Sequence, residues 1–179
     1  MSLYLITGNK DKFTEVKEIL TVVEQLDIDL PEIQHIDAKE VIKAKLLEAL
    51  NHKEGEFIVE DTSLYIDCLN GLPGPLAKWF LKAIGNDGLF EIVERLGRTG
   101  AEAKTIVGYA KSHEEIYYFE GNIKGKIVSP RGNFGFGWDQ IFQPEGSRKT
   151  FAEMTLEEKN QISMRRIALN HLKEFLREM

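Results

Sequence analysis

Cysteine is almost absent from this chain, since Cys68 is the single cysteine among 179 residues. One cysteine cannot form an intramolecular disulfide, which fits a reducing cytoplasm. The chain also has no apolar run approaching 18 residues, and its first apolar stretch, Leu3–Ile6, is far too short for a membrane span or a signal sequence. We therefore expect a cytoplasmic protein with no membrane partner.

Positive charge is also scarce, because 23 Lys and Arg residues stand against 29 Asp and Glu residues, for a net charge of −6. Proteins bind phosphate backbones through dense Lys and Arg patches, so this balance argues against a nucleic-acid partner and leaves small phosphate compounds. No Walker pattern and no G-x-G-x-x-G occurs, and the four histidines lack the spacing of a zinc site. The commonest nucleotide loops and a zinc centre are not expected.

The length and the 42% hydrophobic content suit a single domain over residues 1–179. Its first half alternates strand and helix patterns, whereas strand patterns follow one another directly later in the chain. This order predicts an α/β fold with a mixed sheet. The expected strands are residues 3–6, 26–30, 57–59, 64–69, 105–110, 116–119 and 123–128. The expected helices are one that begins near residue 10, then residues 38–52, 76–84 and 87–96, and one from residue 155 to the C-terminus.

Two carboxylates and two hydroxyls follow an apolar run near the middle of the chain. Phe57–Val59 is typical of a buried strand, and Glu60, Asp61, Thr62 and Ser63 come directly after it. Ligands of open α/β sheets bind beyond the carboxyl ends of such strands, and successive side chains point to opposite faces. We therefore expect one acid to face a given ligand atom while the other holds a metal or acts from the far face. The alternative is a turn capped by one of the two hydroxyls.

The turn Thr7–Gly8–Asn9 follows the first expected strand and precedes a helix that begins near Lys10. Strand, glycine turn and helix N-terminus in this order form an anion-binding geometry, because free backbone N–H groups and the positive helix end point to one place. Lys10 and Lys12 add positive charge there. In the absence of a phosphate-loop motif, a plain strand-to-helix turn is the alternative.

Residues 129–139 have the most unusual composition, with three glycines among aromatic side chains. Glycine lets a backbone approach a ligand closely, and a free aromatic face can stack on a nucleobase. The alternative is a loop whose aromatics anchor it to the core. Farther on, Thr155–Glu158 has the form of a capping box, and Lys159, Arg165 and Arg166 lie early in the helix that it begins. Cations there oppose the helix dipole, which favours a nearby anionic or carbonyl-bearing ligand.

Six short motifs lie in order along nearly the whole chain: Thr7–Lys12, Leu30–Gln34, Glu60–Leu64, Gly71–Pro75, Phe136–Asp139 and the segment from Ala152 to Asn160. Together they resemble the inosine triphosphate pyrophosphatase family. The resemblance implies hydrolysis of the noncanonical purine nucleoside triphosphates ITP, dITP and XTP to the monophosphate and pyrophosphate. It implies a long mixed sheet flanked by helices, with two lobes around a central cleft. It also implies dependence on Mg²⁺, with Mn²⁺ as the alternative, and a homodimer.

The resemblance also assigns roles to single residues. Asp61 matches the acid that orients or deprotonates the attacking water, Glu60 matches its acidic neighbour near the metal, and Glu32 matches a metal-binding glutamate. The residues that match the family's phosphate contacts are Thr7, Gly8, Asn9, Lys10, Asp11, Lys12 and Lys43. Lys43 is also placed among the catalytic residues. Phe136 matches the residue that stacks on the base. The residues that match the remaining substrate contacts, with Phe136 among them, are Thr62, Ser63, Phe136, Gly137, Trp138, Asp139, Lys159, Ser163, Met164 and Arg165. Donors at the base edge favour the 6-oxo group of inosine and xanthosine over the 6-amino group of adenine.

Two positions depart from the family pattern. The family usually has Ser-His-Arg where this chain has Ser163-Met164-Arg165, and commonly has Asp-Pro where this chain has Asp139-Gln140. The first change removes a polar group from the expected base pocket, and the second alters the rigidity of a loop. Two alternatives therefore stay open: a nucleotide-binding sensor of the same fold with weak turnover, and a nucleotide pyrophosphatase of broader specificity.

Overall fold

The computed structural model of the protein describes residues 2–179. Within this range the α-helices are α1 (Lys10–Ile19), α2 (Ala38–His52), α3 (Ala77–Leu96), α4 (Leu156–Ile162) and α5 (Met164–Glu178). The strands are β1 (Leu3–Ile6), β2 (Val23–Leu26), β3 (Glu56–Ile66), β4 (Pro73–Gly74), β5 (Gly100–Ala110), β6 (Ile116–Ile127) and β7 (Phe142–Pro144). Two single-turn 3₁₀ helices cover Asp67–Leu69 and Phe151–Glu153.

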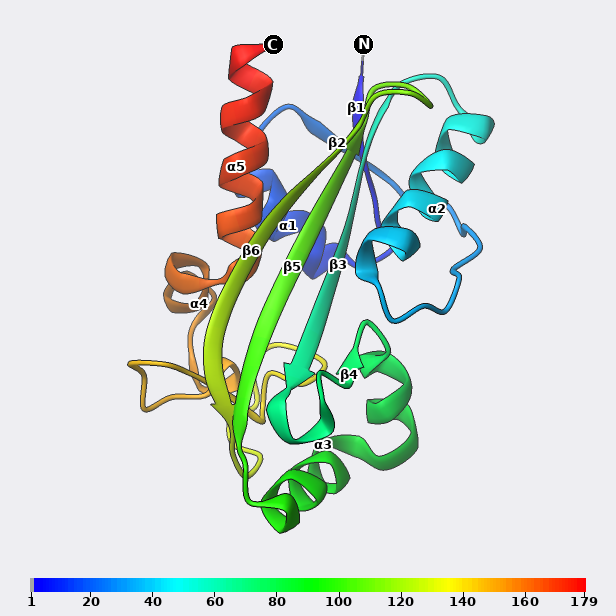
Figure 1. The fold of residues 1–179 in the computed structure, drawn as a ribbon. Coiled ribbons are helices and arrows are strands. Elements are labelled where there is room, and N and C mark those ends of the chain that lie inside the picture. Colours follow the sequence, from blue (N-terminus) through cyan, green and yellow to red (C-terminus); the bar gives the residue numbers. More distant parts are fainter. Residues whose placement is uncertain (1) are drawn as a thin grey trace. The chain divides into compact units, whose positions relative to one another are not determined.

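The strands form a mixed sheet in the order β2-β1-β3-β5-β6-β7, with β4 paired to β3. Strand β1 pairs in parallel with β2 and with β3. Strands β3 and β4 pair antiparallel, as do β6 and β7. Figure 1 shows the long strands β3, β5 and β6 side by side. The predicted mixed α/β sheet is therefore confirmed.

The chain divides into two compact units. Unit 1 contains the chain up to Asp61 together with Thr105–Gly121 and Arg165–Met179. Unit 2 contains Thr62–Lys104 and Asn122–Met164. Strands β3, β5 and β6 contribute residues to both units.

The apolar residues of β3 in unit 1 alternate between two buried clusters. Ile58 packs in a cluster with Val16 of α1 and Leu172 of α5. Phe57 and Val59 pack in a second cluster with residues of α2. Because successive strand side chains point to opposite faces, α1 and α5 cover one face of this part of the sheet and α2 covers the other. Each residue of β3 in unit 1 can thus be assigned to one of the two faces.

A single buried cluster forms the core of unit 2. It contains Trp138, Phe142 and Phe151 together with Leu89 of α3, and the ring centroids of Trp138 and Phe142 lie 5.5 Å apart. Helix α3 is interrupted at Gly85, whose φ of 69° and ψ of −177° are not helical. This interruption confirms the break predicted between the two helices at residues 76–84 and 87–96.

Three predicted strand boundaries are wrong. Strand β3 continues unbroken through Glu60 and Asp61 to Ile66, because the buried charge of Glu60 is neutralised by cations and does not force the chain to solvent. The strand expected at residues 26–30 instead ends at Leu26, since its partner β1 ends at the paired residue Ile6. The turn expected at residues 121–122 lies inside β6, which runs without interruption.

Two smaller expectations are also wrong. The C-terminal helix is divided in two, because Ser163 has an extended backbone (φ −71°, ψ 144°) that ends α4 before α5 begins. Cys68 lies half-buried in a 3₁₀ turn and not inside a strand. The capping box at Thr155 and Glu158 is confirmed, with the Thr155 backbone N–H donating to Glu158 Oε2 at 2.8 Å.

Candidate active site

The adjacent acids Glu60 and Asp61 lie level with the end of β1. Leu5 pairs with Ile58, so β1 stops at Ile6 beside Val59 while β3 runs on. The prediction that these acids follow the end of their own strand is therefore wrong, because β3 continues past them and it is the neighbouring strand β1 that ends there. Alternation along β3 places the Glu60 side chain on the face covered by α1 and α5 and the Asp61 side chain on the face covered by α2.

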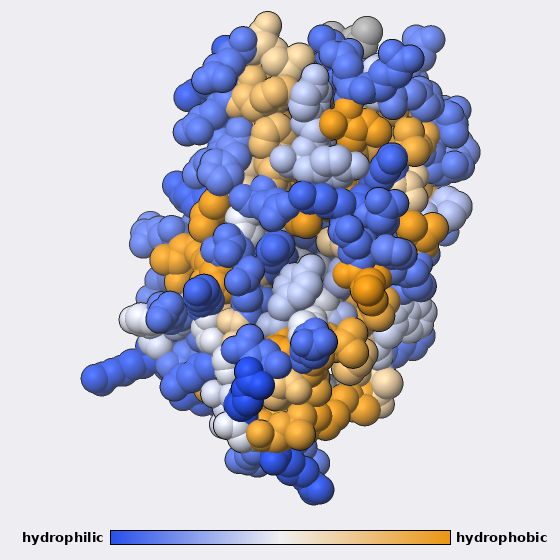
Figure 2. Space-filling model, in the orientation of Figure 1, coloured by the Kyte–Doolittle hydropathy of each residue, from blue (hydrophilic) through white to orange (hydrophobic). Residues whose placement is uncertain are grey.

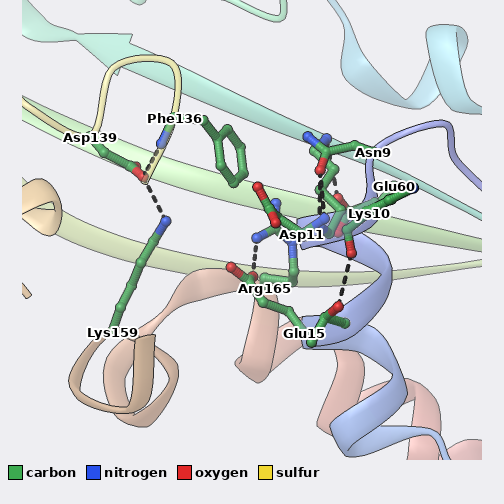
Figure 3. A network of polar contacts seen from close by, with 11 residues as sticks. Asn9, Lys10, Asp11, Glu15, Glu60, Phe136, Asp139, Lys159 and Arg165 are labelled. Carbon is green, nitrogen blue, oxygen red and sulfur yellow. Dashed lines mark hydrogen bonds and ion pairs between the residues drawn. The ribbon is translucent and has the colours of Figure 1, made fainter. Parts of the chain in front are cut away.

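Glu60 belongs to a buried cluster of charges in unit 1 that joins three elements (Figure 3). Arg165, the second residue of α5, donates from Nε to Glu60 Oε2 at 2.7 Å and from Nη1 to Oε2 of Glu15 on α1. The ammonium of Lys12 lies 3.2 Å from Glu60 Oε1 as an ion pair. Arg165 is only 2% exposed and Glu15 only 4%. We call Lys12, Glu15, Glu60 and Arg165 the charge cluster of unit 1.

The charge cluster shifts the pKa values of Glu60 and Arg165. Burial opposes ionisation of Glu60, but the positive charges of Arg165 and Lys12 outweigh burial and lower its pKa to about 2. For Arg165, the carboxylates of Glu60 and Glu15 likewise outweigh burial and raise its pKa. Glu60 is therefore a carboxylate at any physiological pH. The guanidinium expected at the base edge is, in this structure, buried against two carboxylates.

The turn expected to bind phosphate is held by hydrogen bonds from its own side chains and from Gln25 of β2. The backbone N–H of Asn9 donates to Thr7 Oγ1 at 3.1 Å, and Gln25 Nε2 donates to the Thr7 carbonyl at 2.9 Å. Asn9 caps α1, because its Oδ1 accepts the backbone N–H groups of Asp11 at 2.9 Å and Lys12 at 3.1 Å. Two amides of the helix N-terminus are therefore already bonded, and an anion here would compete with the Asn9 side chain for them.

Other nominated residues lie on or near α2. Lys43 is exposed on the helix, and Glu32 is exposed in the segment before it. The carboxylate of Glu32 contacts Lys45 Nζ of α2 at 3.0 Å. Glu32 therefore lies close to the helix that covers the face of β3 to which Asp61 points.

The oxygen donors of unit 1 suit a hard divalent cation in part. Glu60 does not fit, because both of its oxygens contact cations and it lies on the opposite face from Asp61. Asp61 and Glu32 are carboxylates of the kind that hold Mg²⁺ together with phosphate oxygens, although Oε1 of Glu32 already contacts Lys45. Over residues 2–179, no three His, Cys, Asp or Glu side chains are gathered as a metal-binding group.

A second group of nominated residues lies in unit 2, around the buried carboxylate of Asp139 (Figure 3). The backbone N–H of Phe136 donates to Asp139 Oδ2 at 3.0 Å, and Lys159 Nζ donates to the same oxygen at 2.8 Å. The Lys159 ammonium also lies 5.0 Å from the centroid of the Phe136 ring. Asp139 and Lys159 are 4% and 5% exposed, so this pair orients the Phe136 backbone from inside the unit.

Four further residues nominated in unit 2 are also buried. Trp138 is 6% exposed and Met164 2% exposed, and both belong to the apolar core. Ser63 and Ser163 are also buried, at 1% and 2%. The structure thus gathers Phe136, Asp139 and Lys159 around one polar group and embeds the neighbouring tryptophan and methionine in the core.

Residues 3–175 match the model of the Ham1 family. The chain belongs to the Ham1 family. A protein named inosine triphosphate pyrophosphatase from Schizosaccharomyces pombe is 45% identical over 179 residues, covering 98% of this chain and 95% of the relative. A solved HAM1 protein from Coxiella burnetii is 25% identical, with a TM-score of 0.86 over the whole of both chains. A nucleoside-triphosphatase / dITP/XTP pyrophosphatase from Mycobacterium abscessus is 28% identical, with a TM-score of 0.76 over 96% of this chain and 98% of that one.

Sequence reasoning overlooked Glu15, a central residue of this Ham1 family member. Glu15 lies three residues after Lys12 and four before Ile19, which places it on the same face of α1 as both. A carboxylate within an apolar stripe signals a buried cation partner, because an unpaired buried charge is strongly destabilising. That signal was available, but no feature of the sequence identifies Arg165, 150 positions away, as the partner.

Asn86 of unit 2 was also overlooked, and Gln140 was noted only as a departure that alters the rigidity of a loop. Gln140 stands where the resembled family commonly has proline, and its Nε2 donates to the Gly132 carbonyl at 3.0 Å. Asn86, directly after the interruption of α3, contacts the same loop.

Among the described residues, no helix is both long enough and apolar enough to cross a membrane.

Proposed function

We propose that this Ham1 family member hydrolyses the noncanonical purine nucleoside triphosphates ITP, dITP and XTP to the nucleoside monophosphate and pyrophosphate. The observation that carries the proposal is the 45% identity, over 98% of the chain, to a protein named inosine triphosphate pyrophosphatase. The polar groups of units 1 and 2 support it, because one contains lysines and acids suited to a triphosphate and the other an aromatic residue suited to a base. We propose that residues 1–179 act as one catalytic domain.

The hydrolytic step is assigned to unit 1. The anhydride bond between the α- and β-phosphates breaks, a water oxygen forms the new bond to phosphorus, and the water proton passes to the carboxylate of Asp61. We assign this role to Asp61 because it matches the acid that orients or deprotonates the water in the resembled family. We assign a positioning role to Glu60 because its carboxylate is held by Arg165 and Lys12. Glu60 instead positions Lys12, whose ammonium approaches β3 from the segment Thr7–Lys12. We assign phosphate contacts to this segment and to Lys43.

The triphosphate brings about four negative charges, so carboxylates can face it only with a cation between them. Asp61 and Glu32 are the residues that would hold Mg²⁺, with Mn²⁺ as the alternative ion. When bound, the ion would neutralise charge on the phosphate oxygens. The exposed ammonium of Lys43 would neutralise part of the remaining charge.

Base recognition is assigned to unit 2. Phe136 would stack on the purine, and Lys159, held by Asp139 at 2.8 Å, would supply donors toward the 6-oxo oxygen. Adenine presents an N–H donor at that place, and an unpaired buried donor costs about 1 to 3 kcal/mol. The preference for ITP over ATP follows from that mismatch.

The experiment that tests the function is an assay of pyrophosphate and orthophosphate release over ITP, dITP, XTP and ATP, with and without Mg²⁺. We expect pyrophosphate from the first three, little turnover of ATP, and loss of turnover when the ion is chelated. Release of orthophosphate with a diphosphate product would contradict the proposal. Binding without turnover would favour the sensor alternative, and comparable turnover of many bases would favour the broader pyrophosphatase.

We also propose that the protein is a cytoplasmic homodimer. Five large apolar side chains between residues 72 and 96 are exposed by 38% to 53%: Leu72, Trp79, Ile84, Ile92 and Leu96. Ile92 and Leu96 are one turn apart on α3, and Figure 2 shows apolar surface in the region where this helix lies. Burial of such side chains between two copies would remove apolar area from water. Light scattering gives the molar mass that tests the dimer.

A further inference from the structure

The loop that contains Phe136 needs fixing from outside its own backbone. Gly132, Gly135 and Gly137 all have positive φ, at 86°, 76° and 62°. Glycine reaches such conformations without strain, but it also has more alternative conformations than any other residue. A loop with three of them within six residues keeps one shape only if other groups hold it. The bond from the Phe136 N–H to Asp139 is one such restraint.

Asn86 and Gln140 supply a second restraint. Asn86 Nδ2 donates to the Gly137 carbonyl at 3.1 Å and to Gln140 Oε1 at 3.2 Å. Gln140 Nε2 donates in turn to the Gly132 carbonyl at 3.0 Å. The two amides therefore bridge Gly132 and Gly137, on either side of the segment that contains Phe136. The non-helical backbone of Gly85 interrupts α3 directly before Asn86.

The orientation of both amides follows from chemistry. Backbone carbonyls only accept hydrogen bonds, so the Gln140 group at Gly132 and the Asn86 group at Gly137 must both be NH₂. The Gln140 oxygen then faces the second proton of Asn86. Only one orientation of each side-chain amide satisfies all three hydrogen bonds.

Asn86 also shows a feature that stability alone does not explain. Its Oδ1 is buried and has no hydrogen-bond partner within residues 2–179, which is destabilising for a polar atom. Both of its donors, in contrast, are used on the loop. The residue is therefore placed to use its NH₂ group, which holds the carbonyl of Gly137, the residue after Phe136.

We propose that Asn86 and Gln140 are positioning residues that hold Phe136 in place for the purine base. The proposal rests on the proposed function, because it assumes that Phe136 stacks on the substrate. Neither residue touches the reacting phosphates, and their effect passes through the backbone of residues 132–137. The base is held equally before and during the hydrolytic step, so the loss of this restraint weakens binding more than turnover.

Asn86→Asp is the sharpest test, because it keeps the shape of the side chain and replaces both donors by an oxygen that faces two acceptors. We expect the KM for ITP to rise about tenfold with kcat changed by less than about twofold, the scale expected for one or two lost hydrogen bonds. Gln140→Glu, which removes only the contact to Gly132, should have a smaller effect in the same direction. The control is Asp87→Asn, the reverse change at the exposed neighbouring residue.

Hydrogen exchange of residues 132–140 gives a readout that does not depend on turnover. In Asn86→Asp the Phe136 amide should exchange faster, and in Asp87→Asn it should not change. Unchanged exchange together with an unchanged KM would overturn the proposal, as would an equal fall of kcat and kcat/KM. If the wild type does not hydrolyse ITP, the proposed function fails, and the exchange rates still show whether Asn86 holds the loop.

Discussion

Replacement of Glu60 by glutamine tests the charge cluster of unit 1. In the folded protein the pKa of Glu60 is about 2, compared with an ordinary value of 4.5. A carboxyl whose pKa is lowered by folding stabilises the protein above its unfolded pKa, and this contribution is lost as the pH falls toward the folded value. The difference between the folded and the ordinary pKa of Glu60, at about 1.4 kcal/mol for each pKa unit, corresponds to about 3 kcal/mol of folding stability at pH 7. At pH 3 only about 1 kcal/mol of it remains.

The measurement is urea unfolding of the wild type and of Glu60→Gln at pH 7 and at pH 3. We expect the free energy of unfolding to differ between the two proteins by about 3 kcal/mol at pH 7 and by about 2 kcal/mol less at pH 3. The control is Glu114→Gln, the same chemical change on an exposed turn residue, which should alter stability little at either pH. A difference for Glu60→Gln that is the same at both pH values would show that the carboxylate charge does not stabilise the fold, and would refute the reasoning.

Two further substitutions separate turnover from packing. Asp61→Asn should lower kcat for ITP by about 10² or more while substrate binding largely survives, and an unchanged kcat would remove Asp61 from its assigned role. Met164→His would raise the ratio of kcat/KM for ITP over ATP by about five- to tenfold if position 164 reads the base. Because Met164 is 2% exposed in the apolar core, we expect instead a lower Tm with an unchanged ratio.

Several features were predictable because they depend on neighbours in the sequence. The helix at residues 38–52 was predicted with its observed bounds, since its apolar residues recur at helical spacing. The break at Gly85 and the capping box at Thr155 were predicted from single residue types. The end predicted for strand β3 before Glu60 was wrong because it depended on neighbours in space. A charged residue was assumed to end the strand, and the cations that neutralise Glu60 could not be known from the sequence.

The sequence by itself determined the family, the mixed α/β sheet and the stretches where polar side chains gather, because these depend on local pattern and on motifs in order along the chain. Only the tertiary structure decided how those side chains pair. Arg165 meets Glu60 across 105 positions and Glu15 across 150, and Asn86 meets Gln140 across 54. The separation of Glu60 and Asp61 onto opposite faces likewise became certain only when β3 proved continuous. Such pairings depend on which elements pack together, and no spacing along the chain encodes that.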